Sequence, residues 1–138
     1  MELTSGSTRI SSKRLWAGRI MSYLAAAFLL LDAIGKLVKP APVIEATVKL
    51  GYPASVMVTL GVVLLVCTVL YLIPPTSVLG AILLTGYLGG AVATHVRVGD
   101  TLFTILFPVI FGVLLWGGLY LRDKKLQTLI PLRTEVKS

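Results

Sequence analysis

The chain has 138 residues, of which 56% are apolar and 14% are charged, and its mean hydropathy is +0.90. An ordinary soluble domain holds about 45–50% apolar and about 25% charged residues, so this composition excludes that class. The formal net charge of +7 indicates membrane orientation and attraction to anionic headgroups rather than nucleic-acid binding.

Four stretches are long and apolar enough to cross a hydrocarbon core, which takes roughly 20 residues of α-helix. We expect one domain over residues 1–138, an all-α integral membrane four-helix bundle, with spans at 17–38, 54–73, 78–96 and 101–121. The first stretch also resembles a signal peptide, because basic residues precede a short apolar run. No small-residue cleavage site follows that run, so we expect it to stay as the first span.

The first predicted span carries an acid, Asp32, and a base four residues later, Lys36. Residues at this spacing lie on the same face of a helix. Charges within a membrane span are costly, and they usually pair, face the bundle interior and mark a functional position. Asp32 and Lys36 are therefore candidate ligand-binding residues.

A proline-bounded loop follows the first span. Pro40 and Pro42 should stop the first helix, and residues 44–50 have the pattern of a short interfacial helix. The turn 51–53 then leads into the second span. We expect this loop to lie across the outer mouth of the bundle as a partial lid.

The third span combines small residues with a polar stripe. Gly86 and Gly90 have GxxxG spacing and Ala93 extends their face, which favours close helix packing. This packing is expected within the fold, with a homodimer as the alternative. Tyr87 and His95 lie on a second face, and we predict both as ligand-binding residues.

The fourth span has two local signals. Asp100 or Thr101 can cap its start, and capping is the favoured interpretation of Asp100. Pro108 removes a backbone donor near the middle of the span and should kink it. Such a kink can widen a space between helices.

The basic residues predict the orientation. Of 13 Lys and Arg residues, nine lie in the tails and their helix ends, and four lie on the opposite side. The positive-inside rule then places both termini in the cytoplasm, and the candidate site opens outward. Four aromatic side chains should lie near the cytoplasmic boundary: Trp16, Tyr71, Trp116 and Tyr120.

Several motifs resemble those of the DoxX-like membrane proteins. The longest is Gly80-Ala-Ile-Leu-Leu-Thr-Gly-Tyr-Leu-Gly-Gly-Ala-Val-Ala-Thr-His-Val-Arg97, and the resemblance covers roughly residues 15–133. It also includes Asp32-Ala-Ile-Gly-Lys36, Leu50-Gly-Tyr-Pro53, Tyr71-Leu-Ile-Pro74 and Trp116-Gly-Gly-Leu-Tyr-Leu-Arg-Asp123.

The resemblance implies a small four-helix protein of a bacterial inner membrane. The family is named after a subunit of a thiosulfate:quinone oxidoreductase, and distant eukaryotic relatives resemble assembly factors for membrane receptors. Many members carry a Gly-x-x-Glu-Leu pattern early in the second span. This chain has Gly61-Val-Val-Leu64-Leu65 there, so a role that depends on that glutamate does not carry over.

Redox and metal chemistry have little support in the sequence. Cys67 is the one cysteine, which excludes an intramolecular disulfide relay. His95 is the one histidine, which excludes bis-histidine haem, and no cluster has the spacing of a metal site. We therefore do not expect an autonomous enzyme.

Two functions remain open. The first is an accessory or membrane subunit of a quinone-linked redox system, with an outward-facing pocket for a membrane quinone or a lipid. The second is a non-enzymatic assembly or interaction protein, in which the polar residues are structural. In both cases the partners are the lipid bilayer and another membrane protein or a second copy.

Overall fold

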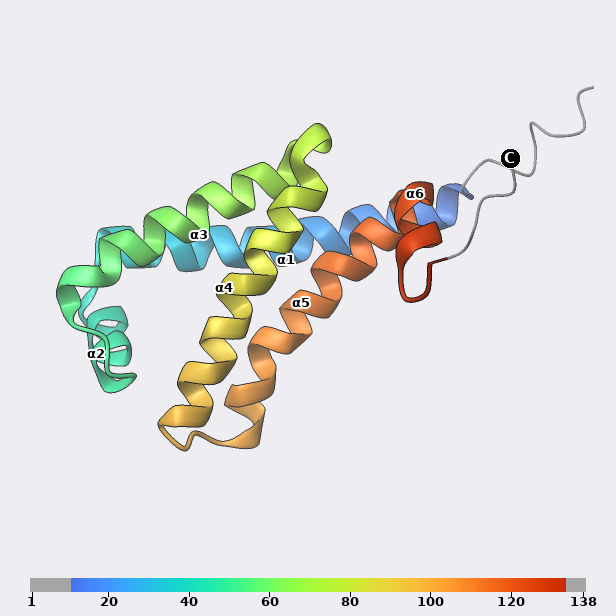
Figure 1. Ribbon diagram of the computed structural model, residues 1–138. Helices are drawn as coiled ribbons and strands as arrows, with labels where there is room; N and C mark the ends of the chain where they lie inside the picture. Colours follow the sequence, from blue (N-terminus) through green and yellow to red (C-terminus); the bar gives the residue numbers. More distant parts are fainter. Residues whose placement is uncertain (1–10, 134–138) are drawn as a thin grey trace, which may run out of the picture.

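The structure is a computed structural model that describes residues 11–133, and these residues form helices joined by short turns (Figure 1). The helices are α1 (Ser12–Val38), α2 (Ala41–Lys49), α3 (Met57–Leu72), α4 (Ser77–Arg97), α5 (Leu102–Arg122) and α6 (Lys124–Leu129). Short 3₁₀ turns, η1 (Ala54–Val56) and η2 (Pro74–Thr76), precede α3 and α4. Four of these segments are long and apolar enough to cross a membrane. The predicted all-α bundle with four apolar helices is confirmed.

The four long helices form a ring of neighbours. Helix α1 packs against α3 and α5, and α4 packs against the same two helices. In Figure 1, α4 and α5 run at an angle to α1 and α3, so the bundle is splayed. We call the start of α1, η2, the end of α5 and α6 the tail end. The end of α1, α2 and the α4–α5 turn form the lid end.

The first helix is longer than predicted. The side chain of Ser11 accepts a hydrogen bond from the backbone N–H of Arg14 at 3.3 Å, and α1 therefore begins at Ser12 rather than at residue 17. Such an N-cap satisfies one of the free donors of the first turn. At the other end, Lys39 takes a left-handed conformation and donates its N–H to the Gly35 carbonyl. The predicted short helix of the loop is confirmed as α2.

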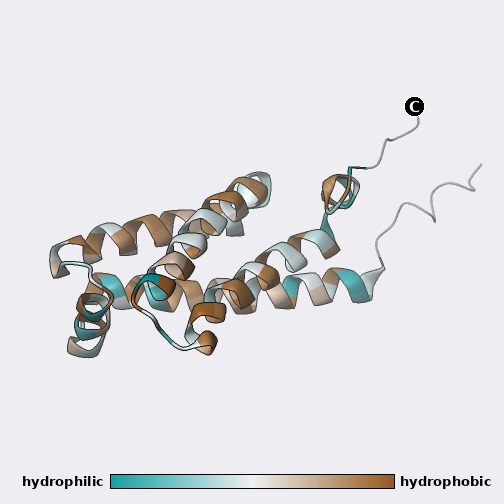
Figure 2. Cartoon of the chain, turned by 60° about the horizontal axis from the view of Figure 1, so that its bottom comes forward, coloured by the Kyte–Doolittle hydropathy of each residue, from teal (hydrophilic) through white to brown (hydrophobic). Residues whose placement is uncertain are grey.

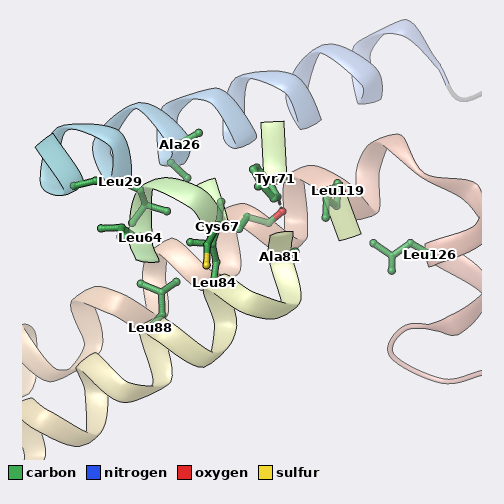
Figure 3. Close-up of a cluster of buried hydrophobic side chains, with 13 residues drawn as sticks. Ala26, Leu29, Leu64, Cys67, Tyr71, Ala81, Leu84, Leu88, Leu119 and Leu126 are labelled. Carbon is green, nitrogen blue, oxygen red and sulfur yellow. Dashed lines mark hydrogen bonds between the residues drawn. The ribbon is translucent and has the colours of Figure 1, made fainter. Parts of the chain in front are cut away.

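The core lies where the four long helices meet (Figure 3). Leu64, Leu84 and Leu115 are at most 1% exposed, and so is Tyr71. The prediction that Tyr71 belongs to an aromatic belt is therefore wrong. Its position on the buried side of α3 turns it into the core, where the hydroxyl finds hydrogen-bond partners.

Close approach of the helices depends on particular glycines. A Cβ at Gly18 of α1 would lie 2.7 Å from the carbonyl oxygen of Gly118 in α5. A Cβ at Gly80 of α4 would lie 2.5 Å from the Cα of Tyr71 in α3. Only glycine allows these backbones to approach so closely. The interhelical contacts of α1 with α5 and of α3 with α4 depend on these positions.

The small face predicted to pack within the fold does not do so. Gly86, Gly90 and Ala93 are exposed, and a Cβ at either glycine would have nothing within 4 Å. The physical reason is helical phase. At about 100° per residue, this face lies opposite the packed side of α4, which contains Gly80 and Leu84. The alternative, contact with a second copy, stays a prediction.

The outer surface of the bundle is apolar. Figure 2 shows that hydrophobic residues make up much of the long helices, and large apolar side chains such as Leu24 and Val113 are more than 60% exposed. A soluble monomer rarely exposes apolar patches of this extent. The hydrocarbon core of a membrane covers this surface, and the chain is a multi-pass membrane protein.

Candidate functional site

The predicted pair on α1 is formed. The Nζ atom of Lys36 donates to Oδ1 of Asp32 at 2.6 Å, and the side chain of Lys36 is 15% exposed against 39% for Asp32. Phe28, one turn earlier, stacks on Phe111 of α5 with 4.4 Å between ring centroids. Since residues four apart share a helix face, the pair lies on the side of α1 that is turned toward α5.

Tyr87, the third predicted residue, lies on α4. It is half-buried on α4, packs against the core and lies within electrostatic range of Asp32 and of Tyr52. In the group of Asp32, Lys36 and Tyr87, a hydrogen bond joins Asp32 to Lys36, and Tyr87 of α4 lies within electrostatic range of Asp32. This group, which we call the polar cluster, holds an acceptor and two kinds of donor.

The loop between α1 and α3 is attached to the end of α4. The hydroxyls of Tyr52 and Thr94 are 2.8 Å apart, and Nη2 of Arg97 donates to the carbonyl oxygen of Leu50 at 2.7 Å. Gly51 has φ +91° and lies so close to Arg97 that a Cβ would be 2.8 Å from its Nη2. Residues 39–53, which we call the lid, therefore bridge the ends of α1 and α4.

His95 belongs to a separate pair. Its Nδ1 atom is 2.7 Å from Oδ2 of Asp100, in the turn that leads into α5. The predicted capping role of Asp100 is wrong, because its carboxylate is bonded to the imidazole. Thr101 is the N-cap of α5 instead, and its side chain accepts from the N–H of Thr104.

A second polar network, at the tail end, was not predicted. The Tyr71 hydroxyl donates to the carbonyl oxygen of Leu115 at 2.7 Å and lies 2.7 Å from Oγ of Ser22. The Arg122 guanidinium donates through Nη2 to the same Ser22 Oγ at 2.9 Å, and through Nε to the carbonyl oxygen of Gly118. The network ties α1, α3 and α5 together. A serine within an apolar run and an arginine at the end of a span were the available signals.

An apolar groove of about 350 Å³ runs between α4 and α5. The indole Nε1 of Trp116 donates to Oγ1 of Thr85 at 2.7 Å on its wall, so this polar group is already satisfied. Helix α5 continues unbroken through Pro108, which lines the groove. None of the four predicted ligand-binding residues lies on the groove, whose lining is Thr85, Leu88, Gly89, Val92, Pro108, Val109, Gly112, Val113 and Trp116.

Within residues 11–133, no three His, Cys, Asp or Glu side chains are arranged to hold a metal ion. The side chains of the polar cluster can form hydrogen bonds and hold a proton. Lys36 and Tyr87 can donate to an oxygen of a ligand, and Asp32 can accept a proton.

The sequence profile of the DoxX-like family matches residues 20–118. The matched region contains the polar cluster, the lid and most of the four long helices. No curated protein and no solved structure gave a match to the chain.

Proposed function

The chain belongs to the DoxX-like family, and from this premise we propose that it is an accessory or membrane subunit of a quinone-linked redox system. Its polar cluster would bind the head group of a quinone or a lipid. The observation that carries this proposal is the Asp32–Lys36 ion pair, which is formed within a membrane span. Ionisable groups at such positions are expensive and are retained mostly where a substrate or proton passes.

The proposed binding mode uses the two ends of the ligand differently. Lys36 and Tyr87 donate hydrogen bonds to oxygen atoms of the head group, and Asp32 accepts or holds a proton. The apolar tail extends between the splayed helices toward the lipid. His95 and Asp100, where α4 leads into α5 at the lid end, would form the entrance. The electron carrier would belong to a partner subunit, because side chains alone do not carry out such redox steps.

The proposed location is a bacterial inner membrane, with both termini in the cytoplasm and the lid end outside. This orientation is supported by the excess of basic residues in and beside the tails. In it, the polar cluster faces the outer leaflet.

A second candidate function is that of an assembly protein that binds other membrane proteins or a second copy. It is favoured by the exposed face of Gly86, Gly90 and Ala93, which nothing in the described part of the chain covers. In this case the Asp32–Lys36 pair would only stabilise the fold.

One experiment separates the two. The protein is purified in mild detergent, and its extract is analysed by mass spectrometry for a stoichiometric quinone or lipid. The variants Asp32→Asn, Tyr87→Phe and His95→Ala are treated in the same way. Glu45→Gln and Tyr23→Phe make matched chemical changes at exposed positions and serve as controls.

The redox proposal predicts a prenylated compound in the wild type and in both controls, lost from site variants that keep their helical circular dichroism. An empty wild type, together with site variants that fail to fold, contradicts it. That result favours the assembly role.

A further inference from the structure

The tail end carries a strong and unbalanced positive charge. Its basic residues come from the start of α1, the end of α5 and α6. Asp123 is the one acidic residue within residues 11–19 and 122–133. Its Oδ1 atom accepts hydrogen bonds from the backbone N–H groups of Lys125 at 2.9 Å and of Leu126 at 3.2 Å. The basic residues are Lys13, Arg14, Arg19, Arg122, Lys124, Lys125 and Arg133.

These cations have no acidic partner within the described residues. The ion pairs of residues 11–133 are Lys36–Asp32 and His95–Asp100, both far from the tail end. The charge of the tail end is therefore available to a ligand.

Two of the cations, Arg14 and Arg122, belong to the two helices of the seam where α1 meets α5. Arg122 lies in this seam, because a Cβ at Gly18 would be 2.7 Å from Cγ of Arg122. The hydrogen bond to Ser22 holds the Arg122 guanidinium in place. Arg14 lies one turn before Gly18 on the same face of α1. The two guanidinium groups thus come from facing helices at the same mouth of the seam.

Helix α6 adds two further cations in a fixed place. Leu126 is 5% exposed and belongs to the hydrophobic core, and Nε2 of Gln127 donates to the carbonyl oxygen of Tyr120 at 2.6 Å. These contacts anchor α6 to the end of α5. Lys124 and Lys125, in its first turn, are exposed and follow Asp123 directly.

Apolar side chains accompany the charge at this end. The side chains of Leu129, Leu132 and Trp16 are each more than half exposed. The guanidinium of Arg19 lies over the Trp16 ring, 5.7 Å from the ring centroid. Figure 2 shows hydrophilic residues at the start of α1 and hydrophobic residues in α6. Tryptophan with basic residues at a helix end is typical of the membrane–water interface.

We propose that the tail end is a binding site for an anionic phospholipid. Arg14, Lys124 and Lys125 bind its phosphate, and Leu129 and Leu132 contact its acyl chains. The charge requires an anion, and the position beside exposed apolar side chains at a membrane boundary selects an anion with a hydrocarbon tail. This site is independent of the function proposed for the lid end.

The test compares two pairs of lysines at opposite ends of the full-length protein. Phosphatidylglycerol and phosphatidylcholine are titrated separately into the detergent-solubilised wild type, and bound lipid is counted by native mass spectrometry. Lys124→Gln/Lys125→Gln removes two charges at the tail end. Lys39→Gln/Lys49→Gln removes two exposed charges at the lid end and is the matched control.

The wild type should bind phosphatidylglycerol more tightly than phosphatidylcholine. A basic residue near an anionic lipid strengthens binding roughly fivefold. The variant Lys124→Gln/Lys125→Gln should therefore bind phosphatidylglycerol about 25-fold more weakly than the wild type does. The control pair should change little, and both variants should keep their helical circular dichroism because the lysines are exposed.

Three outcomes would overturn the proposal. They are equal binding of the two lipids by the wild type, equal losses in the two variants, and displacement of phosphatidylglycerol by an equal concentration of inorganic phosphate. The last result would assign the cations to a free anion.

Discussion

At the scale of single residues, glycines on the same helix have opposite surroundings. Gly80 of α4 touches the backbone of α3, whereas Gly86, less than two turns later, faces outward with open space around it. Gly80→Ala must therefore push α3 and α4 apart, at a cost of about 1–3 kcal/mol for overpacking. Gly86→Ala adds a methyl group without a clash and should keep or slightly raise stability, because alanine favours the helix by up to about 1 kcal/mol.

Thermal unfolding of the two variants in detergent, followed by circular dichroism, checks this prediction. The midpoint should fall for Gly80→Ala and stay or rise for Gly86→Ala. The two variants carry the same substitution in the same helix, so each controls for the other. Equal shifts would mean that the packed face of α4 is assigned incorrectly.

The sequence could predict that glycines of the third span favour close packing, but not which of them pack. Glycines occur on several sides of α4, and the GxxxG spacing points to Gly86 and Gly90. The packed side is decided by where Leu84 and Leu88 meet the other helices. In the same way, spacing predicted the Asp32–Lys36 pair, whereas the partner of His95 depended on the path of the chain after Arg97.

At the scale of elements, the lid depends on few contacts. Thr47 is the one buried residue of α2, and the hydrogen bonds that attach the lid to α4 are Tyr52–Thr94 and Arg97–Leu50. Segments with few buried contacts open at low free-energy cost. The two bonds should therefore control how often the lid detaches from the end of α4.

The double variant Tyr52→Phe/Arg97→Gln removes both bonds. Each contributes at least about 0.5 kcal/mol, so amide hydrogen exchange in residues 41–50 should become at least about fivefold faster, while exchange in α3 and α5 stays unchanged. Tyr23→Phe/Arg19→Gln makes the same chemical changes at exposed positions of α1 and should leave the lid unaffected. Unchanged exchange in residues 41–50 would show that other contacts hold the lid.

Elements differ in how well the sequence could predict them. The four spans and α2 follow from long apolar runs and from prolines, which act locally. Helix α6 was not predicted, because six residues are too few for a periodic pattern, and its position depends on Leu126 reaching the core and on Gln127 reaching Tyr120. The tail-end network needed three helices to be placed before Ser22, Tyr71 and Arg122 could be seen as partners.

At the scale of the whole molecule, the charge distribution matches the two ends of the bundle. The start of α1 and the end of α5 lie at the tail end, and both carry basic residues. A tail end in the cytoplasm would satisfy the positive-inside rule and bring its cations to an anionic leaflet. The lid and the polar cluster would then face outward, where a ligand from the outer leaflet can reach them.

Cysteine labelling in intact cells tests this orientation. Cys67 is the one cysteine of the chain, and it is buried within a span, so the wild type should not react with a membrane-impermeant maleimide. Lys49→Cys should be labelled in intact cells, because Lys49 is exposed on the lid, which the proposed orientation places outside. Lys125→Cys should be labelled only after the membrane is permeabilised. The reverse pattern would place the lid in the cytoplasm, and the polar cluster would then have to take its ligand from the inner leaflet.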